Sequence, residues 1–233
     1  MKKKVLVFTG TYNESENILT FIEGVFKSSD QVDLLIIDDS SPDGTSQIVN
    51  SHEKIDKEVF LIKREKKLGL DTAHKLAYKY AKEKGYEKLI TLDADLSHDP
   101  AKIPLFIDLL NQSEFVIGSR YGEGARNNQP LLRFLISYFG NKLIKILLNS
   151  TLNEHTTSYR GFDLIKLKDF DLDKVNAAGY SFFMGTIHAL KTNGHTMIET
   201  PIVFSDRLHG VSKIPKIEIF RTFFNLLKFF FIK

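Results

Sequence analysis

Short apolar segments alternate with segments of helical periodicity along the first half of the chain, and this alternation constrains the fold more than any other feature. The segments that indicate β-strands are residues 4–10, 32–38, 58–64, 87–93 and 114–119. The segments between them repeat apolar residues at a spacing of about 3.6, as amphipathic helices do, and cover residues 16–28, 45–54, 71–85 and 100–112. Such repetition predicts an α/β fold with a mostly parallel sheet and helices on both faces.

Length and composition limit the other possibilities. A chain of 233 residues with 42% hydrophobic and 26% charged residues is long enough for one α/β domain and too short for two large ones. The net charge of +3 is too small to favour nucleic-acid binding. Because the chain has no cysteine, a disulfide framework and a thiolate metal site are excluded, so any metal must be held by oxygen or histidine ligands. No apolar window reaches the roughly 20 residues of a membrane span.

Polar segments follow each of the five expected strands. In a parallel sheet, ligands bind beyond the carboxyl ends of the strands, so the segments that follow strands are those most informative about function. In chain order these segments are "TYNESEN", "DDSSPDGT", "REKKLGLD", "DADLSHDP" and "GSRYGEGARNN". We expect them to converge on one edge of the sheet and to form a binding site there.

The segment "LDADLSHDP" places Asp93, Asp95 and Asp99 close together. An Asp-x-Asp pair at a strand end can present both carboxylates to one hard divalent cation, which can in turn hold a diphosphate. The alternative is a solvated polar loop, but the four neighbouring polar loops favour a metal on Asp93 and Asp95. Asp99 precedes Pro100, which is typical of a helix cap followed by proline at the first helical position.

Five motifs together carry a family resemblance: "TYNESENI", "IDDSSPDGT", "LGLDTAHKLA", "LDADLSHDP" and "GSRY". In this order and spacing they resemble the family 2 glycosyltransferases, most closely the polyprenyl-phosphate (dolichol-phosphate) mannose synthases. The likeness runs from residue 5 to about residue 213. It implies a GT-A fold, which is Rossmann-like, and inversion at the anomeric carbon. The expected organisation is a GT-A domain over residues 1–213, with a nucleotide-sugar half to about residue 122 and an acceptor half from about 123 to 213, followed by an amphipathic helix over 214–233.

The resemblance also implies which residues bind the nucleotide sugar and the metal. The nucleotide-sugar positions are Thr11, Tyr12, Asn13, Glu14, Asp39, Ser41, Gly69, Asp93 and Ala94, with Asp39 on the base or ribose. Asp93 and Asp95 correspond to the carboxylates that hold the metal, either Mg²⁺ or Mn²⁺.

A second implied set faces phosphate or acts in catalysis. The phosphate-binding positions are Arg120, Arg133, Arg207, Ser212 and Lys213, and the catalytic positions are Asp95, Arg120, Arg133 and Glu154. Arginine offers a planar fork to phosphate oxygens and lysine a compact charge. Two phosphate-bearing substrates, a donor and an acceptor, explain this number of cations. The alternative for each is a solvated surface charge.

The acceptor half departs from the family pattern at more positions than the donor half. Where relatives have Asp-x-Thr-Ser-Gly-Tyr-Arg, this chain has "EHTTSYR", so Glu154 replaces aspartate and Ser158 replaces glycine. Gly185 stands where many relatives have an acidic residue, and Ser97 where some have glutamine. The donor half is therefore the better supported.

The acceptor decides whether a catalytic base is needed. A metal on Asp93 and Asp95 stabilises the charge that develops as the nucleoside diphosphate leaves. A lipid phosphate monoester has a second pKa of about 6, so it is already anionic at neutral pH and needs no strong base. A hydroxyl acceptor does need one, and Glu154 is the best candidate, although a carboxylate in a loop more often accepts hydrogen bonds from nearby backbone.

Two helical segments bear on the acceptor. Residues 131–149 place Arg133, Ser137, Asn141 and Lys145 at steps of four, which predicts a buried helix with one polar stripe. Residues 216–233 have a narrow polar stripe surrounded by phenylalanine, isoleucine and leucine, which favours a helix lying in a membrane interface beside a lipid substrate. A homodimer through the same face is the alternative.

Three functions follow from these features. The first is an inverting transferase, peripheral on the cytoplasmic face of a membrane, that moves a hexose such as mannose or glucose from a nucleotide sugar to polyprenyl phosphate. The second is a family 2 transferase that acts on a glycan or another hydroxyl acceptor. The third is a nucleotide-sugar binding module or a nucleotidyltransferase, but "TGTYNESEN" lacks the glycine-rich, lysine-containing loop typical of the latter.

Overall fold

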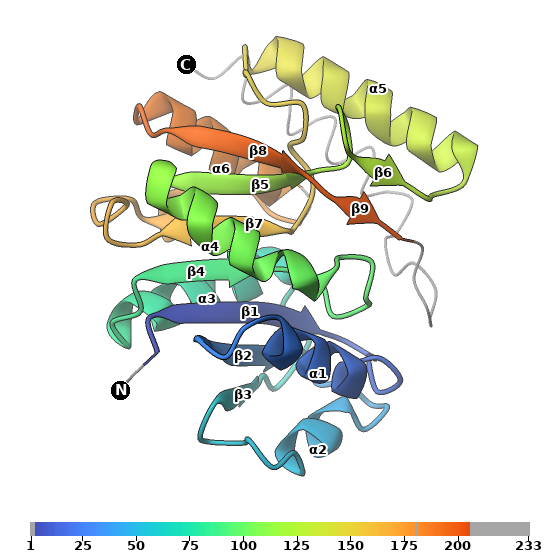
Figure 1. The fold of residues 1–233 in the computed structure, drawn as a ribbon, viewed down its shortest axis with the longest axis vertical. Helices are drawn as coiled ribbons and strands as arrows, with labels where there is room; N and C mark the ends of the chain where they lie inside the picture. Colours follow the sequence, from blue (N-terminus) through green and yellow to red (C-terminus); the bar gives the residue numbers. More distant parts are fainter. Residues whose placement is uncertain (1–2, 180, 206–233) are drawn as a thin grey trace.

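A mostly parallel sheet forms the centre of the protein, as predicted (Figure 1). It has seven strands, because β7 and β8 join the five that the sequence indicates. The computed structural model describes residues 3–179 and 181–205. The strand order is β3-β2-β1-β4-β7-β5-β8. The strands are β1 (Val5–Thr11), β2 (Val32–Asp38), β3 (Val59–Lys63), β4 (Lys88–Thr91), β5 (Phe115–Ser119), β7 (Arg160–Asp163) and β8 (Met197–Pro201).

Helices cover both faces of this sheet because its strands are apolar on both sides. In β2, Leu34 and Ile36 pack into one hydrophobic cluster and Leu35 and Ile37 into the other. One cluster includes residues of α1 and α4, and the other includes residues of α3 and α6. The helices are α1 (Ile18–Ser28), α2 (Thr45–Asn50), α3 (Leu70–Glu83), α4 (Ile103–Gln112), α5 (Leu131–Leu147) and α6 (Ser181–Thr192), with short 3₁₀ turns η1 (Pro100–Lys102) and η2 (Leu172–Lys174).

Strand β7 runs antiparallel between β4 and β5. Arg160 pairs with Thr91 at the end of β4 and with Ile117 near the end of β5. Because β7 is antiparallel, it begins at the edge where its two neighbours end. The loop before β7, residues 154–159, therefore lies beside the loops that follow β4 and β5, and joins the polar edge of the sheet.

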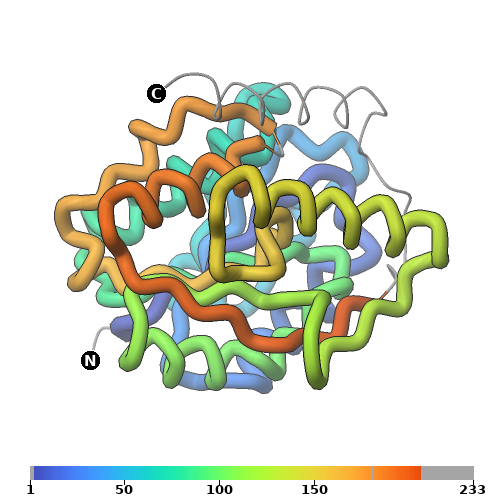
Figure 2. The backbone as a smooth tube through the Cα atoms, turned by 90° about the horizontal axis from the view of Figure 1, so that it is seen from above, coloured from blue at the N-terminus to red at the C-terminus, as the bar shows by residue number. Residues whose placement is uncertain are grey.

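Helix α5 lies at the periphery, beyond β8 and the small sheet of β6 (Arg126–Asn127) and β9 (Val203–Phe204) (Figures 1 and 2). The expectation of a buried helix with one polar stripe was wrong. Asn141 and Ile144 are its buried residues, and most of its large apolar side chains are exposed. The helix packs on the protein through Asn141 and through Ile144, which joins an apolar cluster with Met184, and its opposite, apolar side faces outward.

Several predictions concern residues outside the described part of the chain. These are Arg207, Ser212, Lys213 and the amphipathic helix over 214–233. Within residues 3–179 and 181–205, no helix has both the length and the apolar character needed to cross a membrane.

Candidate functional site

The loops after β1 and β2 are joined by Asp38, a fully buried carboxylate at the end of β2. Its Oδ1 accepts a hydrogen bond from Thr11 Oγ1 at 2.9 Å, and its Oδ2 accepts from the Ser41 backbone N–H at 2.9 Å. Ser41 Oγ in turn accepts the backbone N–H of Asn13 at 3.0 Å. These hydrogen bonds join three residues expected to bind the nucleotide sugar, Thr11, Asn13 and Ser41, around Asp38. We call this group of four residues the Asp38 corner.

Asp39, the next residue, is also buried and pairs with Arg64 at the end of β3. Its Oδ2 accepts the backbone N–H of Gly69 at 3.3 Å, and Arg64 Nη2 donates to the Gly69 carbonyl at 3.1 Å. Gly69 has φ of +96°, a conformation that glycine adopts without strain. Asp39 and Gly69 therefore lie together beside the Asp38 corner, with Arg64 as their shared partner.

Tyr12 and Glu14 complete the loop after β1. The Glu14 backbone N–H donates to Thr45 Oγ1 at 3.0 Å, which ties this loop to the start of α2. Lys67 Nζ lies 3.8 Å from the ring centroid of Tyr12, a cation–π contact between the loops after β1 and β3. These loops, predicted separately from the sequence, are in contact.

Asp93 and Asp95 follow β4, with Ala94 buried between them. Asp95 is buried and its Oδ1 accepts from Ser97 Oγ at 2.6 Å, whereas the Asp93 side chain is 40% exposed. Two carboxylates fit a hard divalent cation. Because the described residues contain no cluster of three or more histidine, cysteine, aspartate or glutamate ligands, a cation here also needs oxygen ligands from a diphosphate or water.

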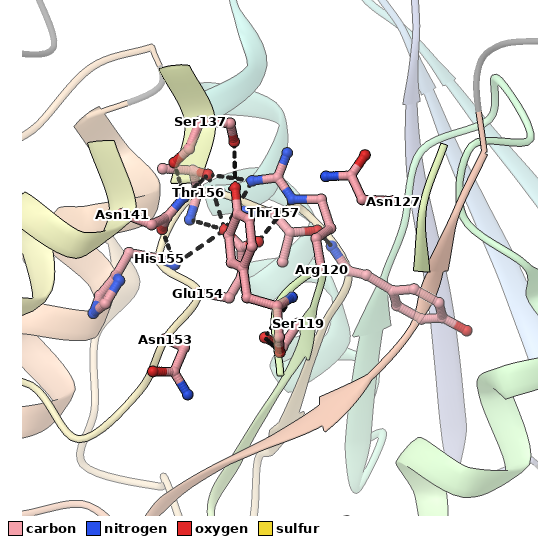
Figure 3. A network of polar contacts seen from close by, with 12 residues as sticks. Ser119, Arg120, Asn127, Ser137, Asn141, Asn153, Glu154, His155, Thr156 and Thr157 are labelled. Atoms are coloured by element: carbon pink, nitrogen blue, oxygen red, sulfur yellow. Dashed lines mark hydrogen bonds and ion pairs between the residues drawn. The ribbon is translucent and has the colours of Figure 1, made fainter. Parts of the chain in front are cut away.

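Arg120 and Glu154 form a buried ion pair (Figure 3). Arg120 Nε donates to Glu154 Oε2 at 2.7 Å and Arg120 Nη2 to Oε1 at 2.9 Å, the bidentate geometry that orients a guanidinium most firmly. Arg120 follows β5, and Glu154 comes from the loop before β7. Within the described residues, Arg120 bonds Glu154 and Thr156 through Nε and Nη2, and its Nη1 makes no hydrogen bond.

The charge state of this pair is fixed by its surroundings. Burial alone raises the pKa of Glu154, but the charge of Arg120, its hydrogen bonds and those from Thr156 lower it to about 2. Burial likewise lowers the pKa of Arg120, and the Glu154 carboxylate outweighs this and raises it, with a smaller contribution from Asp93. Both groups are therefore charged at neutral pH.

The backbone around Glu154 limits what this carboxylate can do. Its Oε1 also accepts the backbone N–H groups of His155, Thr156 and Thr157 at 3.1, 2.9 and 3.2 Å. A fully buried carboxylate that accepts six hydrogen bonds, one of them from the Thr156 hydroxyl, and has a pKa of about 2 is poorly suited to take a proton. The geometry favours the hydrogen-bond acceptor that sequence reasoning named as the alternative to a catalytic base.

The polar side of α5 closes over this pair. Asn141 Nδ2 lies 3.3 Å from Thr156 Oγ1, and Asn141 Oδ1 accepts the His155 backbone N–H at 2.8 Å. Ser137 Oγ lies 2.5 Å from the Tyr121 hydroxyl. Figure 3 shows Ser137 and Asn141 directed from α5 toward Arg120 and Glu154. Two members of the predicted stripe therefore contact the candidate site.

The other two members of the stripe do not contact the Arg120–Glu154 pair. Lys145 bonds Asn153 at 2.7 Å, and Arg133 has no ion-pair partner among the described residues.

Two residues that sequence reasoning did not assign to the site support its loops from beneath. The fully buried Arg160 donates to the carbonyls of His155, Thr157 and Phe183 at 2.8 to 2.9 Å, which fixes the loop before β7 against α6. His98 accepts the Asp93 backbone N–H at Nδ1 (3.2 Å) and contacts Thr157 Oγ1 through Nε2 (3.1 Å). Burial lowers the pKa of His98. A neutral imidazole thus joins the Asp-x-Asp loop to the Glu154 loop.

Other supporting residues were also missed, and their sequence signals differ. Arg64 and Lys67 lie in the polar segment after β3, so their position at the sheet edge was a usable signal. Arg160 was visible as part of "EHTTSYR", but nothing in the sequence shows that its guanidinium caps backbone carbonyls. Asp99 was predicted as a cap and is one, because its side chain accepts the Ala101 N–H.

The structure therefore has the mostly parallel sheet, the polar loops at one edge and the Asp-x-Asp pair after β4 that the resemblance to GT-A glycosyltransferases predicted. The chain belongs to glycosyl transferase family 2, whose model matches residues 6–170. An undecaprenyl-phosphate mannosyltransferase of Micrococcus luteus is 32% identical over 212 residues, which cover 91% of this chain and 87% of that protein. A polyprenol monophosphomannose synthase of Mycolicibacterium smegmatis is 33% identical over 215 residues, covering 91% and 81%.

Solved structures agree on the fold. Glucosyl-3-phosphoglycerate synthase from Mycobacterium tuberculosis, in complex with Mn²⁺, UDP and glucosyl-3-phosphoglycerate, matches with a TM-score of 0.68 at 14% identity, over 97% of this chain and 77% of that one. A mannosyltransferase from Pyrobaculum calidifontis, in complex with GDP-mannose and Mn²⁺, matches with a TM-score of 0.58 at 17% identity, over 90% and 58%. The predicted family and α/β fold are confirmed.

Proposed function

We propose that this glycosyltransferase moves a hexose, with mannose as the first candidate, from a nucleotide diphosphate sugar to polyprenyl phosphate, with inversion at the anomeric carbon. The observation that carries the proposal is the oriented guanidinium of Arg120, which Glu154 holds in place while Nη1 makes no hydrogen bond within the described residues. The names of the two relatives, both about one-third identical over nearly the whole chain, support the same acceptor.

The donor is assigned to the loops after β1, β2, β3 and β4. Thr11, Asn13, Ser41, Asp39 and Gly69 already lie together there through hydrogen bonds, so little ordering is needed on binding. Asp93 and Asp95 are placed to hold Mg²⁺ or Mn²⁺. The cation neutralises charge on the leaving diphosphate.

The acceptor phosphate is assigned to Arg120, with Arg133 on α5 as a second cation. A phosphate monoester carries a nucleophilic oxygen that is anionic at neutral pH, since its second pKa is about 6. The acceptor therefore needs orientation and charge compensation more than it needs a base. This fits a site in which the nearest buried carboxylate, Glu154, is already committed to Arg120 and to backbone N–H groups.

A lipid acceptor also places the enzyme at a membrane surface, as a peripheral protein on the cytoplasmic face. The Phe-rich segment 216–233 supports such attachment through its composition.

Transfer to a short-chain, water-soluble polyprenyl phosphate tests the proposal directly. The purified protein is incubated with a panel of nucleotide sugars and Mg²⁺ or Mn²⁺, and products are identified by mass spectrometry. The matched control acceptor is the polyprenol of the same length without phosphate. We expect product with the phosphate and none with the alcohol. Equal use of the alcohol would favour the second candidate function, transfer to a hydroxyl acceptor.

A further inference from the structure

The outer side of α5 carries a continuous apolar stripe. Leu132, Ile136, Phe139, Leu143 and Ile146 recur at steps of four and three residues and are each 39–72% exposed. At about 100° per residue, this stripe lies opposite Asn141, the side chain that faces the candidate site. A helix with its polar side inward and its apolar side toward solvent leaves the larger hydrophobic area uncovered, which marks an interaction surface.

Charge identifies the partner. Residues 131–147 include Arg133, Lys142 and Lys145 and contain no aspartate or glutamate. Arg133 and Lys142 lie about 100° to either side of the apolar stripe, so cations border it on both flanks. Two copies of this helix packed through the stripe would bring like charges together, which disfavours a subunit contact. An apolar stripe bordered by cations instead matches the acyl chains and anionic headgroups of a lipid bilayer.

We infer that the apolar stripe of α5 is a membrane-docking surface that lies on an anionic bilayer. This inference rests on the proposed lipid phosphate acceptor and adds where the lipid arrives. The inner side of the same helix contacts the Arg120 site through Ser137 and Asn141 (Figure 3). Docking by the outer side places that site within one helix diameter of the headgroup layer, where a lipid-borne phosphate resides.

Vesicle co-sedimentation of the full chain tests the surface. The variant Ile136→Ser/Phe139→Ser removes two members of the stripe without touching Ser137 or Asn141. The matched control, Leu19→Ser/Ile165→Ser, makes the same kinds of change at apolar residues that are 45% and 63% exposed elsewhere. With vesicles of phosphatidylcholine and phosphatidylglycerol, we expect the stripe variant to bind at least about tenfold more weakly and the control to match the wild type. Circular dichroism checks that both variants are folded.

Two further measurements, with vesicles of phosphatidylcholine alone and by light scattering, make the result decisive. Binding to vesicles of phosphatidylcholine alone should be weaker than to the anionic mixture, because the flanking cations lose their partners. Unchanged binding of the stripe variant to anionic vesicles overturns the inference. So does a light-scattering result in which the substitutions convert a dimer to a monomer without changing vesicle binding, since the stripe is then a subunit contact.

Transfer to the short-chain, water-soluble acceptor separates this inference from the proposed function. The stripe variant should keep its turnover with that acceptor and lose it with a long-chain polyprenyl phosphate in vesicles. If the wild type makes no product with the soluble acceptor, the proposed function fails, whereas the co-sedimentation result still reports on the stripe.

Discussion

The Asp38 corner and the Arg120 site stabilise their buried polar groups in different ways. Asp38, at the end of β2, accepts hydrogen bonds from three hydroxyl groups and one backbone N–H. Arg120 and Glu154 are a buried ion pair, surrounded by the loop before β7 and the polar side of α5. Removing one hydroxyl donor leaves Asp38 with its other hydrogen bonds, whereas a buried charge left without its partner is costly. The Arg120 site should therefore be more sensitive to single substitutions than the Asp38 corner.

The largest effect is expected at Glu154. Glu154→Gln leaves the Arg120 guanidinium buried beside a neutral amide, and breaking a buried pair in this way costs about 3–5 kcal/mol. Urea unfolding measures the loss. The double variant Arg120→Met/Glu154→Met removes both charges and should recover only the part of the loss that comes from the unpaired guanidinium, because the backbone N–H groups of residues 155–157 still lack their acceptor. It should not recover transfer. Recovery of transfer in the double variant would show that neither charge is needed for catalysis.

Asp95→Asn should have the next largest effect, and on activity rather than on folding. The substitution keeps the shape of the side chain and removes the charge that the metal needs. We expect transfer to fall about 10²–10³-fold, the loss typical of removing one electrostatic stabiliser of the transition state. Calorimetric titration with Mn²⁺ and the nucleoside diphosphate of the active donor should show weaker metal binding at unchanged thermal stability. Near-wild-type turnover with added Mg²⁺ or Mn²⁺ would remove Asp95 from the metal site.

Arg120→Lys separates charge from geometry. Lysine keeps the positive charge beside Glu154 but cannot form the planar fork that Arg120 makes with it. We expect kcat/KM for the phosphate acceptor to fall by a factor that corresponds to about 1.5–3 kcal/mol of lost transition-state stabilisation, the range for a charged hydrogen bond. The KM for the donor should stay within about twofold. If the donor KM rises instead, Arg120 binds the donor diphosphate.

A buried histidine in the core should make the stability of the fold depend on pH. His74 on α3 is buried against Phe8 and Phe183, and burial lowers its pKa from 6.5 to about 3. The unfolded chain thus binds a proton below pH 6.5 that the folded protein excludes, so the stability from this group is lost as pH falls. Between pH 7 and pH 5 the expected loss is about 2 kcal/mol. His74→Phe should flatten the pH dependence of urea unfolding by that amount, and an unchanged slope would contradict the assignment.

The sequence predicted the parallel strands β1 to β5 because each is a short apolar run bounded by polar residues, but it did not predict β8, which pairs in parallel with β5. It also predicted that Asp93, Asp95 and Arg120 follow strands, and the sheet topology then places them at one edge. It did not predict β7, because Arg160–Asp163 is short, contains Gly161 and includes charged residues at both ends. Pairing with β4 and β5 supplies the stability that local propensity does not.

Helix α5 shows another limit of sequence reasoning. Its periodicity correctly separated a polar side from an apolar side, but periodicity cannot tell which side faces the protein. The apolar side was assigned to the interior by the usual rule for soluble helices. The structure reverses this, because Asn141 bonds the His155 backbone and Thr156 while Phe139 faces outward. Long-range hydrogen bonds of this kind are not visible in a local pattern.

The smallest effect is expected for Asp99→Ala, and comparison with Asp171→Ala tests whether Asp99 is a helix cap or a metal ligand. Asp99 and Asp171 each cap a 3₁₀ turn by accepting a backbone N–H two residues later, from Ala101 and Asp173 respectively. Asp99 lies close to the Asp-x-Asp pair in sequence, whereas Asp171 precedes η2, which packs against α3. If both are caps, Asp99→Ala and Asp171→Ala should each lower the free energy of unfolding by about 1 kcal/mol and leave kcat within about twofold of wild type. A third metal carboxylate would behave differently, since its loss would reduce activity and metal affinity far more than stability. Parallel urea unfolding and steady-state kinetics on the two variants therefore assign Asp99 to the helix start or to the metal site.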